Sequence, residues 1–165
     1  MARGRPLEVE QELLESFAQS GLVTEYLVHV IPDEIWRSDP PTGRGRSIAA
    51  IVAHIQSVRR TFARMGGAEP GPPSLDREKS TRAQAAEALR RSTDDLSRLF
   101  ETAIGAKQTR VKGMPRRVVN MMLYLMQHDA HHRGQISGLA RDLGHEFQGE
   151  EIMRLWGWKA LPPSF

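Results

Sequence analysis

The chain has 165 residues, 39% hydrophobic and 26% charged, which fits one water-soluble domain over residues 1–165 with a core of its own. Its formal charge is only +3, and its arginines are scattered in pairs such as Arg59-Arg60, which argues against a nucleic-acid-binding surface. It contains no cysteine, which excludes disulfides, thiolate metal ligands and a cysteine nucleophile.

The distribution of apolar residues also bears on location. No apolar run approaches the roughly 20 residues that span a bilayer. The first residues, Met-Ala-Arg-Gly-Arg-Pro, lack the apolar stretch and the cleavage site of a signal peptide. We therefore expect a cytoplasmic protein that is not associated with a membrane.

The first predicted helix runs from about Leu7 to Ile31, and Pro32 ends it or forces a bend. Residues 37–44, rich in proline and glycine, are predicted to form a loop. The apolar residues of the helix recur at intervals of three and four, the spacing that lines one helix face. They are Leu13, Phe17, Val23, Leu27 and Val30.

The second predicted helix begins near Ser47 and stops at Gly66-Gly67. One stripe of it is apolar and consists of Ile48, Ile51, Ile55, Val58 and Phe62. Residues 69–79 contain Gly71-Pro72-Pro73 and are too rich in proline for a helix. This long connection permits the helices on either side of it to run parallel.

The third predicted helix starts at Thr81, which forms a capping box with Gln84. Leu89, Leu96, Phe100 and Ala103 mark its buried face.

The fourth predicted helix has Pro115 in its first turn and ends at Leu143, followed by Gly144 as a left-handed cap. The remaining residues, 145–165, suggest a short helix and a tail whose aromatic residues, Trp156 and Trp158, pack across the bundle. Because no segment has the pattern of a strand, we predict an all-α fold, a four-helix bundle with a long crossover connection.

Two histidines of the fourth helix, His128 and His132, are the strongest candidates for chemistry. At about 100° per residue they share an arc of about 80° with Met121, Leu125 and Leu139, so both face inward. At spacing i, i+4 two imidazoles can converge on one metal ion, with Zn–N distances of about 2.0–2.1 Å. The alternative is a pair of hydrogen-bonded core histidines, and the spacing alone does not decide between the two.

A third candidate, His54, lies about 40° from Val58 at the edge of the apolar stripe of the second helix. A lone histidine in such a place is more often a core residue than a ligand. The other histidines, His29, His131 and His145, are interpreted as surface groups or as groups that support the site.

Other residues near the pair have weaker interpretations. Gln135, which lies on the same arc, could orient a ligand or form an interhelical hydrogen bond. Asp129 could orient an imidazole, but a neighbouring residue projects some 100° away, which argues against this role. Arg133 and Gly134 are expected to serve packing, the arginine as a bridge to a helix end or a dimer partner and the glycine through close helix approach.

The string from His128 to Ile136, His-Asp-Ala-His-His-Arg-Gly-Gln-Ile, resembles the hallmark of the DinB/YfiT-like family of helical-bundle metalloproteins. Residues 47–55, which end in His54-Ile55, resemble the weaker motif of that family on its second helix. The resemblance covers nearly the whole chain in helix order. It implies a DinB-like four-helix bundle, often a homodimer, with a metal site made by His54, His128 and His132.

The resemblance also implies a range of activities. Members of that family include thiol transferases and maleylpyruvate isomerases, so we expect a metal-dependent enzyme that acts on a small molecule, of the thiol S-transferase or isomerase type. The alternative is a noncatalytic metal- or ligand-binding stress-response protein. The expected cofactor is a divalent metal ion, zinc or nickel first and iron or copper next, with a low-molecular-weight thiol as a further candidate. The sequence identifies no catalytic residue.

Overall fold

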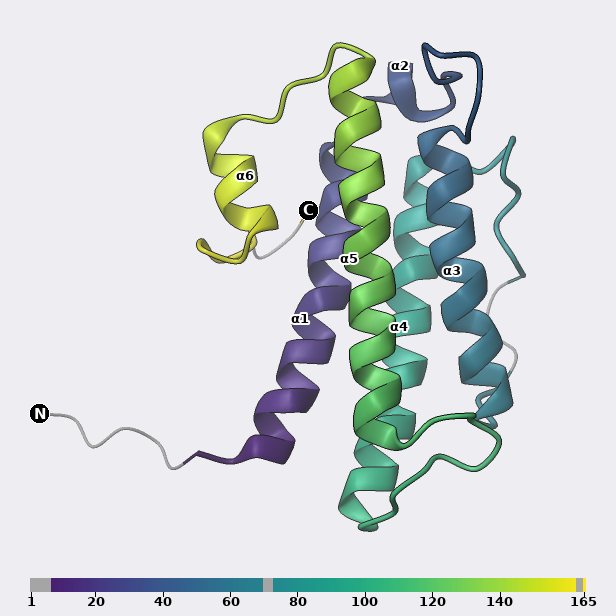
Figure 1. The fold of residues 1–165 in the computed structure, drawn as a ribbon, viewed down its shortest axis with the longest axis vertical. Helices are drawn as coiled ribbons and strands as arrows, with labels where there is room; N and C mark the ends of the chain where they lie inside the picture. Colours follow the sequence, from purple (N-terminus) through teal and green to yellow (C-terminus); the bar gives the residue numbers. More distant parts are fainter. Residues whose placement is uncertain (1–6, 70–72, 163–164) are drawn as a thin grey trace, which may run out of the picture.

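The computed structural model describes residues 7–69, 73–162 and 165, and these residues form helices and loops without a strand (Figure 1). Four long helices make the bundle: α1 (Val9–Val30), α3 (Ile48–Met65), α4 (Arg82–Gly105) and α5 (Val118–Asp142). Two short helices, α2 (Asp33–Trp36) and α6 (Gly149–Leu155), lie outside it. The predicted all-α fold is therefore confirmed.

The order of the helices in space follows from the long connection between α3 and α4. Figure 1 shows α3 and α4 running in the same direction, opposite to α1 and α5, so the chain crosses back along the bundle after α3. Helices α1 and α3 each pack against both α4 and α5. The predicted crossover is confirmed, although residues 70–72, which include Gly71 and Pro72, lie outside the described residues.

Local signals define most of the helix ends. The Ser47 side chain accepts a hydrogen bond from the Ala50 amide, and Thr81 and Gln84 form the predicted capping box. Gly144 follows α5 with a φ of 87°, as expected for a left-handed cap. The ends of α1 differ from the prediction by one or two residues, within the usual fraying of helix termini.

The start of α5 was predicted wrongly. Helix α5 begins at Val118, and Pro115 lies in the preceding loop, where its carbonyl accepts a hydrogen bond from Arg110. This loop passes against the end of α3: a Cβ on Gly113, whose φ is 89°, would lie 2.0 Å from the Met65 carbonyl oxygen. The close approach requires glycine there and delays the helix.

Helix α2 was not predicted, and it closes one end of the bundle. Trp36 is buried, and its indole N–H donates to the Ser80 carbonyl at 2.8 Å. Asp33 forms an ion pair with Arg82 at the start of α4. The sequence did not reveal these four residues as a helix because a single helical turn carries no periodicity.

The C-terminal region contains the predicted short helix, α6, which packs beside α1 (Figure 1). The prediction that Trp156 and Trp158 pack on the bundle is wrong, since the two residues are 75% and 76% exposed. Phe165 packs there instead, with its ring 5.4 Å from the Tyr26 ring. The tryptophans follow the end of a seven-residue helix and project beyond the bundle.

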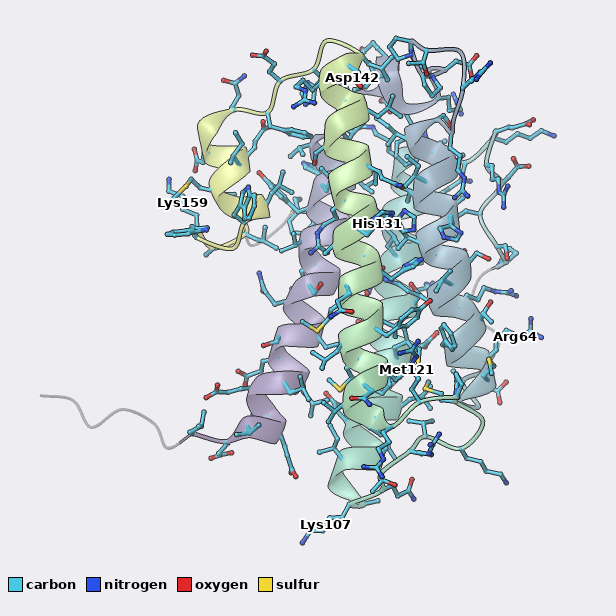
Figure 2. All side chains as sticks on the ribbon, in the orientation of Figure 1. Arg64, Lys107, Met121, His131, Asp142 and Lys159 are labelled. Carbon is cyan, nitrogen blue, oxygen red and sulfur yellow. The ribbon has the colours of Figure 1, made fainter. Side chains whose placement is uncertain are left out.

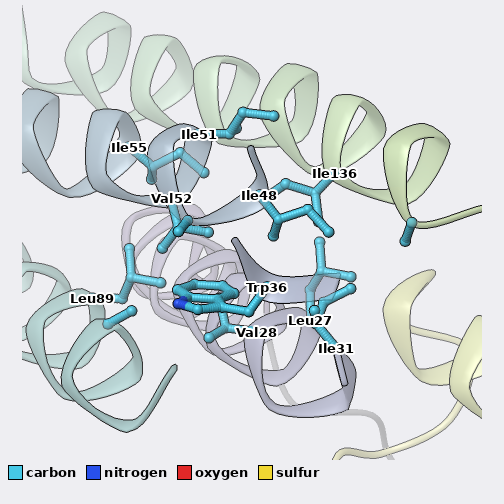
Figure 3. Packing of buried hydrophobic residues seen from close by; sticks show 13 residues of the cluster. Leu27, Val28, Ile31, Trp36, Ile48, Ile51, Val52, Ile55, Leu89 and Ile136 are labelled. Carbon is cyan, nitrogen blue, oxygen red and sulfur yellow. The ribbon is translucent and has the colours of Figure 1, made fainter. Parts of the chain in front are cut away.

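The core consists of two apolar clusters with a layer of polar side chains between them. The Trp36 cluster, shown in Figure 3, fills the end near α2, and the Phe100 cluster fills the other end. The central polar layer lies at mid-length of the four long helices. Its buried members are Thr24, Gln56, Arg59, Ser92, Thr93, Asp129 and His132. In the part of the chain that the structure describes, no helix is long and apolar enough to cross a membrane.

Candidate metal centre

Three histidines from two helices meet at the edge of the central polar layer. His54 comes from α3, and His128 and His132 come from successive turns of α5. One ring nitrogen of each lies within 4.8 Å of the others, and the Nε2 atoms of His54 and His128 are 3.3 Å apart. The structure thus brings together all three residues that the sequence pattern singled out.

The burial of His128 and His132 agrees with their predicted place on the inner face of α5. The His128 side chain is 13% exposed and His132 is 6% exposed, while their neighbour His131 is exposed to solvent. Figure 2 shows His131 on α5, halfway along the bundle. Among the described residues, the three histidines form the one group of histidine, cysteine or carboxylate side chains with metal-ligand spacing.

The other nitrogen of each α5 ring contacts an acceptor on the same helix. His128 Nδ1 lies 3.5 Å from Asp129 Oδ1, and His132 Nδ1 lies 2.8 Å from Gln135 Oε1. Carboxylate and amide oxygens accept hydrogen bonds, so these contacts favour the tautomers with a proton on Nδ1. In both rings the lone pair is then on Nε2, the atom available to a metal.

Gln135 has a clearer role than the sequence suggested. Its amide oxygen accepts from His132, and its amide nitrogen lies 3.1 Å from His131 Nε2, where it can donate. Both contacts are made within α5, so Gln135 does not use them for the interhelical hydrogen bond that the sequence offered as an alternative. Gln135 orients the His132 ring.

Asp129 was interpreted wrongly, because it does support a histidine. Its carboxylate is buried and is held by Arg59, whose Nε and Nη2 donate to Oδ2 at 2.9 and 2.5 Å. The other carboxylate oxygen faces His128. The 100° between neighbours does not separate the two side chains, since His128 Nδ1 and Asp129 Oδ1 are 3.5 Å apart.

The charge of Asp129 is maintained by its partners. Burial alone would raise the pKa of this carboxyl, but the Arg59 charge and the hydrogen bonds from His128 and Arg59 hold the pKa below its usual range. Arg59 is itself fixed by hydrogen bonds to Thr93 and to the Leu89 carbonyl. The carboxylate is therefore an anionic acceptor for the His128 ring at neutral pH.

Arg133 is a second cation, partly buried, that reaches from α5 to α1. Its guanidinium donates to the Thr24 hydroxyl at 2.9 Å and to the Ser20 carbonyl at 3.3 Å. The expected bridge to a helix end is thus a bridge to the middle of α1. Gly134 is exposed, and no described atom lies within 4 Å of the position that a Cβ would take on it. The close helix approach expected at this glycine is therefore not found within the described part of the chain.

Two of the three histidines, His54 and His132, are kept in the form that binds metal. Burial lowers the pKa of His54, and the neighbouring His132 and His128, followed by Arg46 and Arg77, lower it further. Burial also lowers the pKa of His132, against the opposing effect of the hydrogen bond with Gln135. His54 and His132 are therefore neutral at pH 7, with lone pairs free for a cation.

The geometry of these nitrogens fits a divalent metal ion. A tetrahedral ion with Zn–N distances of about 2.0–2.1 Å holds its nitrogens about 3.3 Å apart, close to the 3.3 Å between His54 and His128. Two unprotonated nitrogens at this distance repel each other unless a proton or a cation lies between them. An all-imidazole donor set suits zinc, nickel, iron or copper.

Comparison with known proteins supports one family. The sequence model of the DinB family matches residues 5–155, a range that includes all six helices. Neither the curated proteins nor the solved structures gave a match to the chain.

Proposed function

We propose that this chain, which belongs to the DinB family, binds a divalent metal ion through His54, His128 and His132 and uses it in a reaction on a small molecule. The observation that carries the proposal is the convergence of three imidazole nitrogens within 4.8 Å of one another. The orientation of the two α5 rings by Asp129 and Gln135 supports it, because metal-binding histidines usually have such partners.

Three protein ligands are typical of catalytic metal sites, in which a further position is open to water or substrate. A metal held by His54, His128 and His132 would lower the pKa of a water or thiol bound to it, or would polarise a substrate oxygen. His54 and His132 supply neutral nitrogens, and Asp129 adds one negative charge behind His128.

The reaction class that we favour is a thiol-dependent S-transfer or an isomerisation. Because the chain has no cysteine, a thiolate nucleophile has to come from a low-molecular-weight thiol. Zinc and nickel are the first candidates for the metal, with iron and copper as alternatives. A homodimer in the cytoplasm stays a prediction, as does the alternative of a noncatalytic binding protein.

Elemental analysis of tag-free protein tests the metal site. We expect about one equivalent of metal in the wild type, and its loss in His54→Ala, His128→Ala and His132→Ala. His131→Ala is the matched control, since this exposed histidine neighbours the site without belonging to the group. Full occupancy in all three ligand variants would contradict the proposal.

A second measurement separates the enzyme from the binding protein. Metal-loaded protein that consumes a low-molecular-weight thiol in the presence of an electrophile, and loses this turnover in His128→Ala, supports the enzyme. Thiol binding detected by thermal shift without any turnover favours the noncatalytic alternative.

A further inference from the structure

Two aromatic rings continue the line of histidines toward the N-terminal end of α5. Tyr124 lies one turn before His128, and the two ring centroids are 6.0 Å apart. Phe62, two turns after His54 on the antiparallel α3, packs edge-on against Tyr124 at 5.8 Å. Both rings are partly exposed. Phe62 and Tyr124 therefore form an aromatic strip that begins beside the candidate metal centre.

The positively charged side chain of Arg116 contacts Tyr124 of this aromatic strip. The guanidinium carbon of Arg116 lies 4.7 Å from the centroid of the Tyr124 ring, and Arg116 is exposed. Within the described residues, neither this guanidinium nor the Tyr124 hydroxyl takes part in a hydrogen bond or an ion pair. The stacking on Tyr124 holds the position of Arg116 while its N–H donors stay available.

We propose that the three histidines, the aromatic strip and Arg116 together form an elongated substrate site for an amphipathic carboxylate. The metal-binding end of this substrate lies at the histidines, its apolar or aryl part contacts Phe62 and Tyr124, and its carboxylate binds Arg116. The inference rests on the proposed function, because the bound metal holds one end of the substrate.

The spacing and the chemistry of the three parts define the substrate class. The distance from Arg116 to the His128 ring is at most the sum of the 4.7 Å from Arg116 to the Tyr124 ring and the 6.0 Å from that ring to His128, so the two polar ends of the substrate are separated by an aryl group or a short chain. A guanidinium binds a carboxylate through two parallel hydrogen bonds, and the Tyr124 hydroxyl can donate a third. Exposed aromatic edges favour an apolar segment between the two ends.

A pair of probe thiols that differ in one charge tests this site. Full-length protein loaded with cobalt(II) is titrated with 4-(mercaptomethyl)benzoate and with its neutral analogue 4-methylbenzyl mercaptan, and binding is followed by the thiolate-to-cobalt absorption band. We expect the wild type to bind the carboxylate about tenfold more tightly, the effect of a charge-assisted hydrogen bond.

The variants assign this preference to particular residues. Arg116→Gln is expected to remove the preference and to leave binding of the neutral thiol unchanged. Arg117→Gln is the matched control: it removes the same charge from the next residue, which makes no cation–π contact with Tyr124, and should retain the preference. Tyr124→Leu is expected to weaken binding of both thiols, with unchanged circular dichroism as the check on folding.

The outcomes separate the two proposals. Equal binding of both thiols by the wild type, or an equal loss of preference in Arg116→Gln and Arg117→Gln, overturns the elongated site and leaves the metal centre intact. Failure of the wild type to take up cobalt overturns the proposed function itself.

Discussion

Along each long helix of the bundle, apolar side chains give way to polar ones at mid-length and then resume. The Trp36 and Phe100 clusters on either side consist of buried apolar residues, and each of their large aliphatic or phenylalanine side chains contributes roughly 1.5–3 kcal/mol by leaving water. The central polar layer instead buries Arg59 and Asp129, a pair that adds little or nothing relative to apolar residues of the same size. The two clusters therefore stabilise the bundle, whereas the central polar layer has a function other than stability.

That function is the orientation of the histidines. A chain of contacts leads from Thr93 on α4 through Arg59 on α3 to Asp129, and from there to His128. The first two contacts join different helices, and the last joins two neighbouring residues of α5. The layer thus links the candidate metal centre to α4, which contributes no ligand.

The largest expected effect comes from breaking the buried ion pair. Arg59→Met leaves the Asp129 carboxylate buried without its partner, which should destabilise the fold by about 3–5 kcal/mol. Urea denaturation measures this free energy of unfolding. In the Phe100 cluster, Leu96→Met should cost less than about 1.5 kcal/mol, because it conserves volume in an apolar site.

The double variant Arg59→Met/Asp129→Leu sharpens the comparison. Since it removes both charges, we expect it to recover most of the lost stability while it impairs metal binding. If the double variant were as unstable as Arg59→Met, the polar layer would itself be a source of stability and the contrast with the clusters would fail.

Gly21→Ala tests the layer from α1. A Cβ on Gly21 would lie 2.4 Å from Thr93 Cγ2 and 2.7 Å from Thr93 Oγ1, the atom that accepts from Arg59. We expect a loss of about 1–3 kcal/mol, measured by urea denaturation, because Thr93 has to move. Gly138→Ala is the control, since no described atom lies within 4 Å of its Cβ position. Equal stability of the two variants would show that the Thr93 side chain moves away from the new Cβ without a cost in free energy.

Gln135→Ala separates orientation from stability. Loss of the acceptor for His132 Nδ1 should weaken metal binding about tenfold, at the low end of the 10–100-fold range known for hydrogen-bond partners of metal-binding histidines. The free energy of unfolding should change little. Competition with a chromogenic chelator measures the affinity. Gln127→Ala changes another exposed glutamine of α5 and should bind metal like the wild type. If Gln135→Ala and Gln127→Ala bound metal with equal affinity, Gln135 would have no role in orienting His132.

The smallest expected effect is a dependence of stability on pH in metal-free protein. The pKa values of His54 and His132 are lowered in the folded state from about 6.5, so the unfolded chain binds more protons just below that pH. Stability should therefore fall as the pH drops through 6.5, as measured by urea denaturation between pH 8 and pH 5.5.

The control for this pH effect is a histidine outside the layer. His54→Gln should flatten the pH dependence, whereas His29→Gln, which changes an exposed residue, should not. An unchanged slope in His54→Gln would assign the pH effect to other groups.

The sequence by itself determined the long helices, most of their ends and the inward direction of His128 and His132. These features are local: a helix repeats every 3.6 residues, and a cap such as Ser47 or Thr81 satisfies donors only a few residues away. The family motif added His54, which the spacing on its own helix did not distinguish from a core histidine.

Only the tertiary structure decided which side chains meet across helices. Asp129 supports His128 because Arg59, 70 positions earlier in the chain, keeps its carboxylate charged in the interior. Arg116 reaches Tyr124 because the loop before α5 turns at Gly113 instead of continuing as a helix. Such contacts depend on the relative positions of packed helices, which no periodicity within a single helix can specify.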